Sequence, residues 1–360
     1  MYIYENYHLA MSPQTIIDSH IHLWPQETSN EQGHAWMTPG MPLAKPHLLK
    51  DYQKASKYTG GQEVDPEVQG VVYIETDVRY DSPESGDLAT WTKGPLDEIL
   101  FLRSIVEGKY GEQDSKMLLG LVPWAPIDQP TSVFDEYLTL AKDMAGPVAW
   151  ARIKGFRYLL QAIADPMAFE KVVFGDHFIA NLKLLGKRGL SFDVGVDQRS
   201  GGTWQLQAVG KAMEMAHDGV PESEKVMFVI NHLCKPEFSI ESENFQQWRV
   251  AVERLSKLSR TYMKLSGAFS EMPEGLTSPE QIVRTIKPWV THVLSVFGPK
   301  KVMFGSDWPV CNVKGPAAEA SWPVWKEVVQ LLLSDAELSL SENDIQSIWS
   351  GTAVQAYRLG

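Results

Sequence analysis

Eight short apolar runs, rich in β-branched residues and separated by amphipathic stretches, organise the sequence. Their first residues are 31 to 55 positions apart, so every gap has room for the crossover helix that parallel strands need. Eight strand–helix units without a hairpin signal predict an α/β fold, a single closed (β/α)8 or TIM barrel over residues 1–360. The alternative is an open, doubly wound sheet in two domains, which the length also allows. The runs are residues 15–21, 70–75, 117–122, 148–154, 190–196, 226–230, 261–265 and 301–304.

Helical periodicity fits the gaps between these runs. Apolar side chains recur at helical spacing over residues 96–105 and again over residues 178–185. A capping-box pattern at Ser341 and Asp344 precedes further apolar residues at this spacing, which predicts a helix over residues 341–357 that packs on the barrel. Long loops, residues 24–50 and 77–95, follow the first and second strands. Loops in this position lie at the C-terminal face of a barrel, where such enzymes build their sites.

The charge balance narrows the range of partners. The chain has 33 basic and 45 acidic residues, a net charge of −12, and only short basic clusters. We expect no nucleic-acid or anionic-membrane surface, because both need several Lys or Arg side chains on one face. No apolar run approaches the roughly 18 residues of a membrane helix, and residues 1–14 lack a leader pattern, so we expect a cytoplasmic protein. The two cysteines give no disulfide framework. The oligomeric state stays open and includes a homo-oligomer.

A histidine pair ends the first strand. His20 and His22 are two positions apart, and such residues point to the same side of an extended chain. Two imidazoles at one point make half of a divalent metal site; the alternative is a pair of structural histidines. Asp307 follows the eighth run, and the first and eighth strands of a closed barrel are neighbours. Asp307 would then lie beside the histidines, able to bind a metal or take a proton from water, unless it only caps a turn. Together the two motifs favour a catalytic site.

Three motifs, taken in order, carry a family resemblance. His20-x-His22 after the first strand, residues 231–236 (NHLCKP) after the sixth and residues 305–309 (GSDWP) after the eighth resemble the amidohydrolase superfamily, in its amidohydrolase-2 branch. Within that branch the sequence is similar to the sugar-acid lactonases of the L-rhamnono- and L-fucono-lactonase type. Residues 155–160 and 262–267 support the likeness, which runs from about residue 16 to residue 357.

The resemblance implies a (β/α)8 barrel that hydrolyses a cyclic ester. Asp307 would be the general base for the attacking water, and His232 would lie over the carbonyl or the leaving oxygen. His20 and His22 would hold a metal or polarise the substrate directly.

The sequence departs from the fuller superfamily pattern at the fifth strand. That run has no histidine, which argues against a binuclear site bridged by a modified Lys154. We expect one divalent metal ion, zinc, with metal-independent catalysis as the alternative. The expected ligands are His20, His22, Glu75 and Asp307.

Five further residues are candidates for substrate binding. Arg157, placed just after the fourth run, could fix a carboxylate or hydroxyl, or form a surface ion pair. Asp193 could reach a substrate hydroxyl or bond within the barrel. A sugar ring could lie against aromatic side chains near strand ends, although loop packing is the commoner role of such side chains. These aromatic residues are Trp24, Trp124 and Trp308.

We therefore expect a hydrolase of carbohydrate metabolism that opens a small-molecule lactone, L-rhamnono-1,4-lactone or a similar aldonolactone, to the aldonate. One alternative is a metal-dependent decarboxylase of an aromatic or unsaturated carboxylic acid, which carbon dioxide release would identify. Another is a catalytically inactive barrel that serves as a binding or scaffold protein. The presence of His20, His22, His232 and Asp307 together speaks against the inactive barrel.

Overall fold

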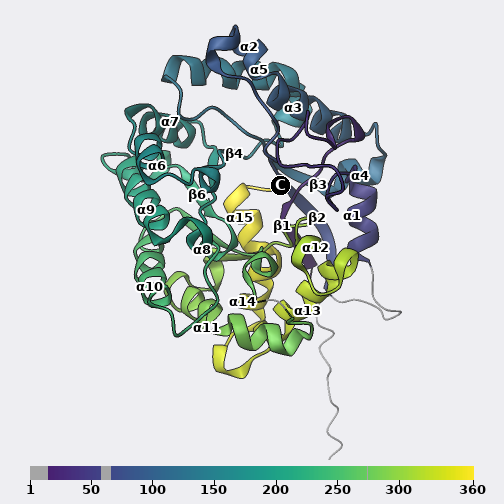
Figure 1. Ribbon diagram of the computed structural model, residues 1–360, viewed down its shortest axis with the longest axis vertical. Helices are drawn as coiled ribbons and strands as arrows, with labels where there is room; N and C mark the ends of the chain where they lie inside the picture. Colours follow the sequence, from purple (N-terminus) through teal and green to yellow (C-terminus); the bar gives the residue numbers. More distant parts are fainter. Residues whose placement is uncertain (1–14, 58–65, 274) are drawn as a thin grey trace, which may run out of the picture.

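Eight parallel strands run through the computed structural model, which describes residues 15–57, 66–273 and 275–360 (Figure 1). Seven of the predicted runs coincide with a strand to within a few residues. Residues 1–14, on which the expectation about a leader rests, lie outside the described residues. The strands are β1 Thr15–Ile21, β2 Glu67–Ile74, β3 Leu118–Val122, β4 Gly155–Arg157, β5 Ser191–Val194, β6 Met227–Ile230, β7 Thr261–Leu265 and β8 Val302–Phe304.

Backbone hydrogen bonds join the strands into a ring. The strands pair in chain order as two parallel sheets, β1-β2-β3 and β4 to β8. At one seam His22 N donates to Trp308 O over 2.8 Å, which joins β1 to the end of β8. At the other seam the backbone of Leu121 in β3 bridges that of Ile153, and Lys154 N donates to Leu121 O over 2.9 Å. The predicted α/β barrel is confirmed, and the open doubly wound sheet is not.

The fourth predicted strand is wrong in position. Residues 148–150 end the helix α5 (Thr131–Trp150), and Val148 is 55% exposed. Gly146, with φ of 64° and ψ of 172°, interrupts that helix, and Pro147 starts a new helical turn because proline fits the first helical position. The strand begins only at Gly155, where a Cβ would lie 2.4 Å from the backbone oxygen of Ser191 in β5. Only glycine allows these two strands to approach so closely.

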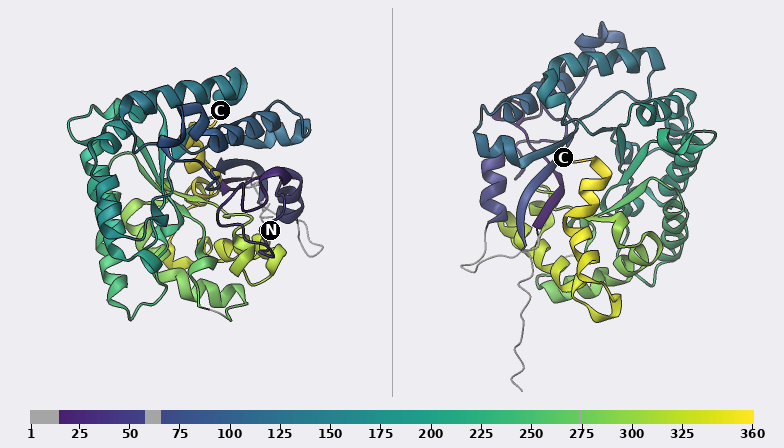
Figure 2. Two further views of the ribbon diagram at one scale, coloured as in Figure 1. Left: turned by 45° about the horizontal axis from the view of Figure 1, so that its top comes forward. Right: turned by 180° about the vertical axis from the view of Figure 1, so that it is seen from behind.

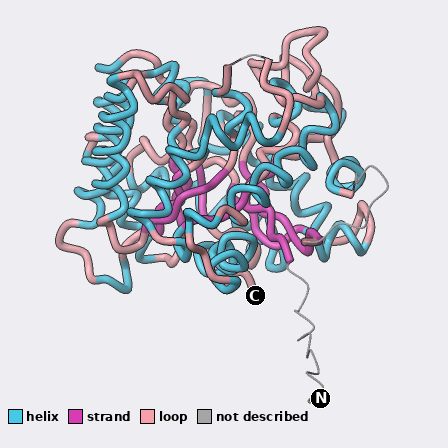
Figure 3. The backbone as a smooth tube through the Cα atoms, turned by 90° about the horizontal axis from the view of Figure 1, so that it is seen from below, coloured by secondary structure: helices cyan, strands magenta, loops and turns pink. Residues whose placement is uncertain are grey.

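Helices form a layer around the strands, as the views in Figures 2 and 3 show. The periodic residues 96–105 and 178–185 lie in α3 and α7, as predicted. The long loops after β1 and β2 are also present, broken only by short helical turns. The helices are α1 Leu49–Ser56, α2 Leu88–Trp91, α3 Lys93–Val106, α4 Glu112–Met117, α5 Thr131–Trp150, α6 Pro166–Val173, α7 Asp176–Lys187, α8 Gln198–Gly201, α9 Thr203–His217, α10 Glu243–Ser256, α11 Pro279–Phe297, α12 Cys311–Lys314, α13 Ser321–Leu333, α14 Glu342–Gln346 and α15 Thr352–Tyr357.

The C-terminal helical segment packs against the strands from inside the ring. The predicted capping box at Ser341 starts α14, and a π-helical turn, Ser347–Gly351, leads into α15 near the middle of Figure 1. Side chains of α15 share one apolar cluster with residues from β1, β2, β3, β6, β7 and β8. The fold thus fills the end at which the strands begin and leaves their C-terminal ends to the loops. Among the described residues, no helix is long and apolar enough to cross a membrane.

Candidate active site

Two histidines, His20 in β1 and His22 just after it, face each other at the C-terminal end of the barrel. The i, i+2 spacing brings their Nε2 atoms to 3.2 Å, as the extended chain predicts. His20 is fully buried and His22 is 6% exposed. His22 Nδ1 lies 2.9 Å from Ile74 O, and since a carbonyl only accepts, this nitrogen carries the hydrogen. In the neutral ring, His22 Nε2 therefore presents its lone pair to the site.

Asp307 lies beside this pair because β8 closes on β1. Its Oδ1 is 3.4 Å from His22 Nε2 and 3.6 Å from His20 Nε2. Its backbone has a left-handed φ of 62°, and its N–H donates to His20 O over 2.9 Å. The adjacency predicted from barrel closure is confirmed.

The buried carboxylate of Asp18, which the sequence reading missed, supports this corner. Asp18 Oδ1 accepts a 2.8 Å hydrogen bond from Ser306 N, next to Asp307. Asp18 Oδ2 accepts bonds from Tyr52 OH and Trp322 Nε1, at 2.8 Å and 3.1 Å. One β1 carboxylate thus ties the turn after β8 to two helices. Asp18 faces the helix layer while His20 faces the interior, because the register of β1 shifts after Asp18, so strand alternation alone gave no signal for its role.

His232 completes the cluster from a left-handed turn after β6. Residues 232–235 all have φ between 46° and 66°, a conformation that costs non-glycine residues roughly 1–2 kcal/mol each. The turn brings His232 Nε2 to 3.8 Å from Asp307 Oδ1, while its Nδ1 lies 2.9 Å from Ser266 Oγ. Gly267 permits this approach, since a Cβ there would lie 2.3 Å from His232 Nδ1. Backbone strain of this kind is typical of functional sites.

A lysine under the histidines is the main residue that the sequence reading missed. Lys264 of β7 is fully buried; its Nζ donates to Asp193 Oδ2 over 2.7 Å and lies 3.2 Å from His20 Nδ1. An ammonium has only donors, so a charged Lys264 leaves His20 with its hydrogen on Nε2, aimed at the lone pair of His22. The contacts form one consistent chain from Asp193 through Lys264 and His20 to His22.

The electrostatics of the cluster favour a charged Asp307 between neutral rings. Burial, together with the charge of Lys264, holds the pKa of His20 well below 6.5, and burial lowers the pKa of His232 to about 3. Burial alone would raise the pKa of Asp307, but the neighbouring histidines and Lys235 outweigh burial, and its pKa lies below 3.8. At neutral pH the site holds a carboxylate that can accept a proton.

The spacing of these side chains fits a single divalent ion. Two ligand atoms bound at 2.0–2.1 Å to a tetrahedral zinc ion lie roughly 3.3 Å apart. The separations among His20 Nε2, His22 Nε2 and Asp307 Oδ1 are 3.2, 3.4 and 3.6 Å. Ligand atoms of His20, His232 and Asp307 also lie within 4.8 Å of one another. A metal on His20 Nε2 would place the ring hydrogen on Nδ1, so Lys264 would have to be neutral and accept from it, in place of the chain described above.

Sequence comparison places the chain in a family. The amidohydrolase family model matches residues 127–359, well over half of the chain. The chain belongs to the amidohydrolase family. The resemblance drawn from the His20-x-His22, 231–236 and 305–309 motifs is therefore confirmed.

Relatives and solved structures resemble this amidohydrolase along almost its whole length. L-rhamnono-gamma-lactonase of Scheffersomyces stipitis is 29% identical over 97% of this chain and 100% of that protein. L-fucono-1,5-lactonase of Burkholderia multivorans is 27% identical over 95% of this chain and 96% of that protein. The crystal structure of an amidohydrolase from Burkholderia multivorans with bound zinc superposes with a TM-score of 0.70 at 24% identity, covering 96% of this chain and 100% of that chain. At that identity the structural likeness speaks for the fold.

Glu75 does not join the ligand cluster of this amidohydrolase. Its Oε1 pairs with Arg157 Nε at 2.5 Å, and its Oε2 accepts a 2.5 Å bond from Asp77 N. Both carboxylate oxygens thus face hydrogen-bond donors rather than the histidines, so the structure does not bring Glu75 into the cluster, and its place as fourth ligand stays a prediction. Arg157 lies in β4 rather than after it and also donates to Glu75 O, so it forms a buried ion pair, neither a surface pair nor an open anion clamp.

Asp193 of β5 bonds within the barrel, the second of its two predicted roles. In addition to the bond from Lys264, it accepts from Tyr357 OH of α15, whose single hydrogen is shared between the two carboxylate oxygens at 2.9 and 2.8 Å. It lies beneath the histidines and is fully buried, which corrects its expected place as a substrate contact.

The three tryptophans that we expected to face a sugar instead pack within the loops. Each is at most 5% exposed, which leaves no face open for a ring. Trp24 donates to Lys45 O and packs on His34, and Trp308 packs on Tyr52. Trp124 lies among other aromatic rings, including that of Tyr80 at 4.4 Å.

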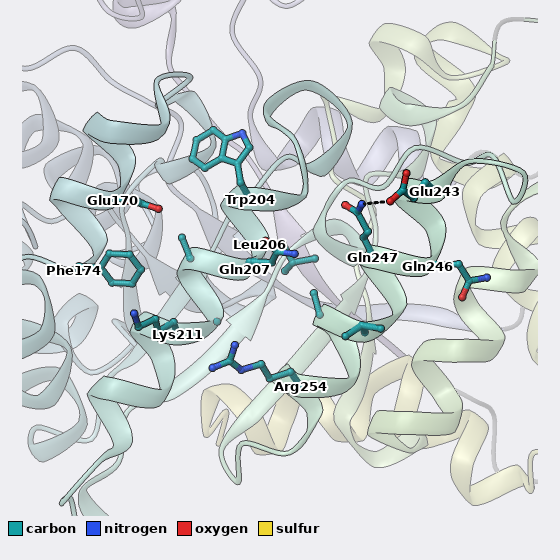
Figure 4. A pocket seen from close by; sticks show the side chains of 14 residues that line it. Glu170, Phe174, Trp204, Leu206, Gln207, Lys211, Glu243, Gln246, Gln247 and Arg254 are labelled. Carbon is teal, nitrogen blue, oxygen red and sulfur yellow. Dashed lines mark hydrogen bonds between the residues drawn. The ribbon is translucent and has the colours of Figure 1, made fainter.

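A groove of about 670 Å³ lies away from this cluster, between α6, α9 and α10 on the outer helix layer (Figure 4). Glu170, Trp204 and Arg254 are among its lining residues, and Lys211 lies over the ring of Phe174 at 5.1 Å. None of the three site histidines lines it. The perturbed titratable groups converge at the strand ends and not in this groove, which makes the strand ends the candidate site.

Proposed function

We propose that this amidohydrolase hydrolyses the lactone of a sugar acid to the aldonate. The observation that carries the proposal is the single carboxylate oxygen of Asp307 within 3.4 to 3.8 Å of the Nε2 atoms of three histidines. Ester hydrolysis needs a base for water and a positive or hydrogen-bonding partner for the developing oxyanion, and the cluster contains both kinds of group. The lactonase names of the two relatives give the substrate class.

Each side chain of the cluster has a step in this reaction. Asp307 takes a proton from the water that adds to the lactone carbonyl. His20, whose Nε2 carries a hydrogen in the Lys264-bonded tautomer, donates toward the developing oxyanion. His232 lies on the other side of Asp307, where it can pass a proton to the ring oxygen as the C–O bond breaks. The ring opens, and the aldonate leaves with its new carboxylate and hydroxyl.

A bound divalent ion, for which zinc is our proposal, would be held by His20, His22 and Asp307. When bound, it would supply Lewis-acid polarisation of the carbonyl oxygen in place of the His20 hydrogen bond, since the ion and that hydrogen share Nε2. Glu75, whose oxygens accept from Arg157 and Asp77 N, stays a predicted fourth ligand that would have to turn toward the histidines to bind the ion.

Among lactones, we propose L-rhamnono-1,4-lactone or a close relative as the substrate. We also propose that the protein is a cytoplasmic enzyme of carbohydrate metabolism. The name of the Scheffersomyces stipitis relative supports the rhamnono configuration, and that of the Burkholderia multivorans relative supports a fucono-1,5-lactone as the neighbouring candidate.

The test is acid release on a panel of aldonolactones, followed by a pH indicator, with wild type and Asp307→Asn. General-base catalysis is worth about 10²- to 10⁴-fold, so we expect a loss of that size. Asp97→Asn, on an exposed face of α3, is the matched control and should keep the wild-type rate. Acid release by Asp307→Asn at the wild-type rate would contradict the proposed role of Asp307. Carbon dioxide release from aromatic acids, with no acid release from any lactone, would replace the lactonase proposal by the decarboxylase.

A further inference from the structure

The loops after β5, β6 and β7 bring one lysine and two carboxylates together. Lys235 Nζ lies 3.2 Å from Glu271 Oε1 and 3.5 Å from Asp197 Oδ2. Asp197 caps the N-terminus of α8 through its other oxygen, and Arg199 lies 3.5 Å from Glu271 Oε2. The three groups thus come from three consecutive strand ends, the face of the barrel that also carries the histidines.

The left-handed turn directs Lys235 to the side of His232. Lys235 N donates to His232 O over 2.7 Å, which closes a four-residue turn. In a turn with about three residues per revolution, residues i and i+3 lie one above the other. The same turn therefore presents the imidazole and the ammonium on one side of the chain. Consistent with this proximity, the charge of Lys235 contributes to lowering the pKa of both His232 and Asp307.

The cluster is partly open, unlike the ion pairs beneath the histidines. The side chains of Lys235, Asp197 and Glu271 are 18%, 13% and 4% exposed, whereas those of Lys264 and Asp193 are fully buried. An ammonium has three N–H donors, and the two carboxylates take at most two of them. A group that enters from the mouth of the barrel meets a donor and acceptors side by side.

We propose that Lys235, Glu271 and Asp197 form the subsite that binds the hydroxyl groups of the substrate and so determine its preference for polyhydroxylated lactones. A hydroxyl both donates and accepts, so adjacent hydroxyls match an ammonium set between carboxylates. Sites built to bond a hydroxyl discriminate strongly against analogues that lack it, because their polar groups are left unpaired. The inference rests on the proposed lactone hydrolysis and extends it to the determinant of substrate choice.

The experiment compares two lactones that differ in hydroxylation. We would measure kcat/KM of wild type, Lys235→Met and Glu271→Gln with L-rhamnono-1,4-lactone and with γ-valerolactone, which has the ring but no hydroxyls. We expect about a 10- to 100-fold loss on the hydroxylated lactone, the value of one hydrogen bond to a charged group, and less than about threefold on γ-valerolactone. Lys257→Met, on the exposed end of α10, is the control and should change neither value.

A second measurement does not depend on turnover. Isothermal titration calorimetry with L-rhamnonate and with 4-hydroxypentanoate should show the same selective loss for the two variants. Equal losses on both lactones and on both acids would overturn the subsite, since a structural defect acts on all ligands alike. Failure of wild type to bind L-rhamnonate would overturn it as well. If wild type opens neither lactone, lactone hydrolysis fails as the function, and the L-rhamnonate titration still decides the subsite.

Discussion

The substitution Asp193→Asn tests the buried chain beneath the histidines. In the wild type Asp193 faces Lys264 Nζ at 2.7 Å, and both groups are fully buried. Asparagine keeps the shape and still accepts a bond from Tyr357 OH, but it removes the charge that compensates the ammonium. Removal of one partner of a buried ion pair costs about 3–5 kcal/mol when the other charge stays.

Lys264 can instead lose its proton in the variant, which limits this destabilisation. Burial lowers the pKa of Lys264 to about 8 despite the favourable charge of Asp193. Loss of its proton at pH 7 therefore costs about 1.4 kcal/mol, and the neutral amine can accept a bond from the side-chain amide that the substitution introduces. With about 1 kcal/mol for the weaker bond, the destabilisation at pH 7 is about 2 to 3 kcal/mol.

The pH dependence follows from the same numbers. Because the folded-state pKa of Lys264 lies below its unfolded value, the unfolded chain binds the extra proton between about pH 8 and 10.5, and wild-type stability rises with pH across that range. The variant loses its proton at lower pH. Its deficit relative to wild type should therefore shrink from about 3 to 4 kcal/mol at pH 6 to about 1 kcal/mol above pH 9.

The assay is urea unfolding followed by tryptophan fluorescence at several values between pH 6 and pH 9.5. Tyr357→Phe is the matched control: it removes a hydrogen bond to Asp193 without changing charge, and its deficit should be constant over this range. A constant deficit of 3 kcal/mol or more in Asp193→Asn would refute the argument, because it would mean that Lys264 keeps its proton throughout.

Three further predictions concern other contacts. In urea unfolding, the free energy of unfolding of Glu98→Gln should equal that of wild type near pH 4.5 and exceed it by up to about 3 kcal/mol above pH 7. Burial raises the pKa of Glu98 to about 7, so wild type loses stability as the pH rises to that value. Equal free energies of unfolding at pH 8 would contradict this. Gly267→Ala should destabilise the fold by about 1–3 kcal/mol and lower kcat, because its Cβ would meet His232 Nδ1 at a φ of 63°; an unchanged kcat would mean that the position of His232 is not needed. His22→Ala should weaken zinc binding by at least about tenfold in calorimetry, since its Nε2 lies 3.2 Å from that of His20; unchanged affinity would place the ion elsewhere.

Much of the fold can be predicted from local sequence patterns. The main error of the prediction, the position of the fourth strand, also has a local cause. Seven strands could be predicted because buried parallel strands are short, apolar and bounded by polar turns. Residues 148–150 have the same composition, but Gly146 and Pro147 restart a helix there. A short apolar run is ambiguous between a strand and a buried helix, and only the pairing of β4 with its neighbours decides.

The contacts of the site likewise fall into those that the sequence predicts and those that it does not. The approach of His20, His22 and Asp307 follows from strand alternation and barrel closure, both properties of the chain in sequence order. The partners of Glu75 and Asp193 do not, because Arg157 and Lys264 are 82 and 71 positions away. One signal was available: Lys264 is a charged residue inside an apolar strand run, where an ionisable group needs a buried partner.

The position of α15 inside the strands has a consequence for biosynthesis. Gln346, just before that segment, donates to Thr15 O of the first strand across 331 positions, and the side chains of α15 then complete the apolar cluster between the strands. A chain that emerges from the ribosome N-terminus first can pair its early strands but cannot fill their interior until residues 352–359 are released. Until then Asp193 also lacks the hydroxyl of Tyr357. The interior of this barrel is therefore filled only once residues 352–359 have been made, and we expect a nascent chain stalled before residue 352 to leave the apolar cluster between the strands exposed.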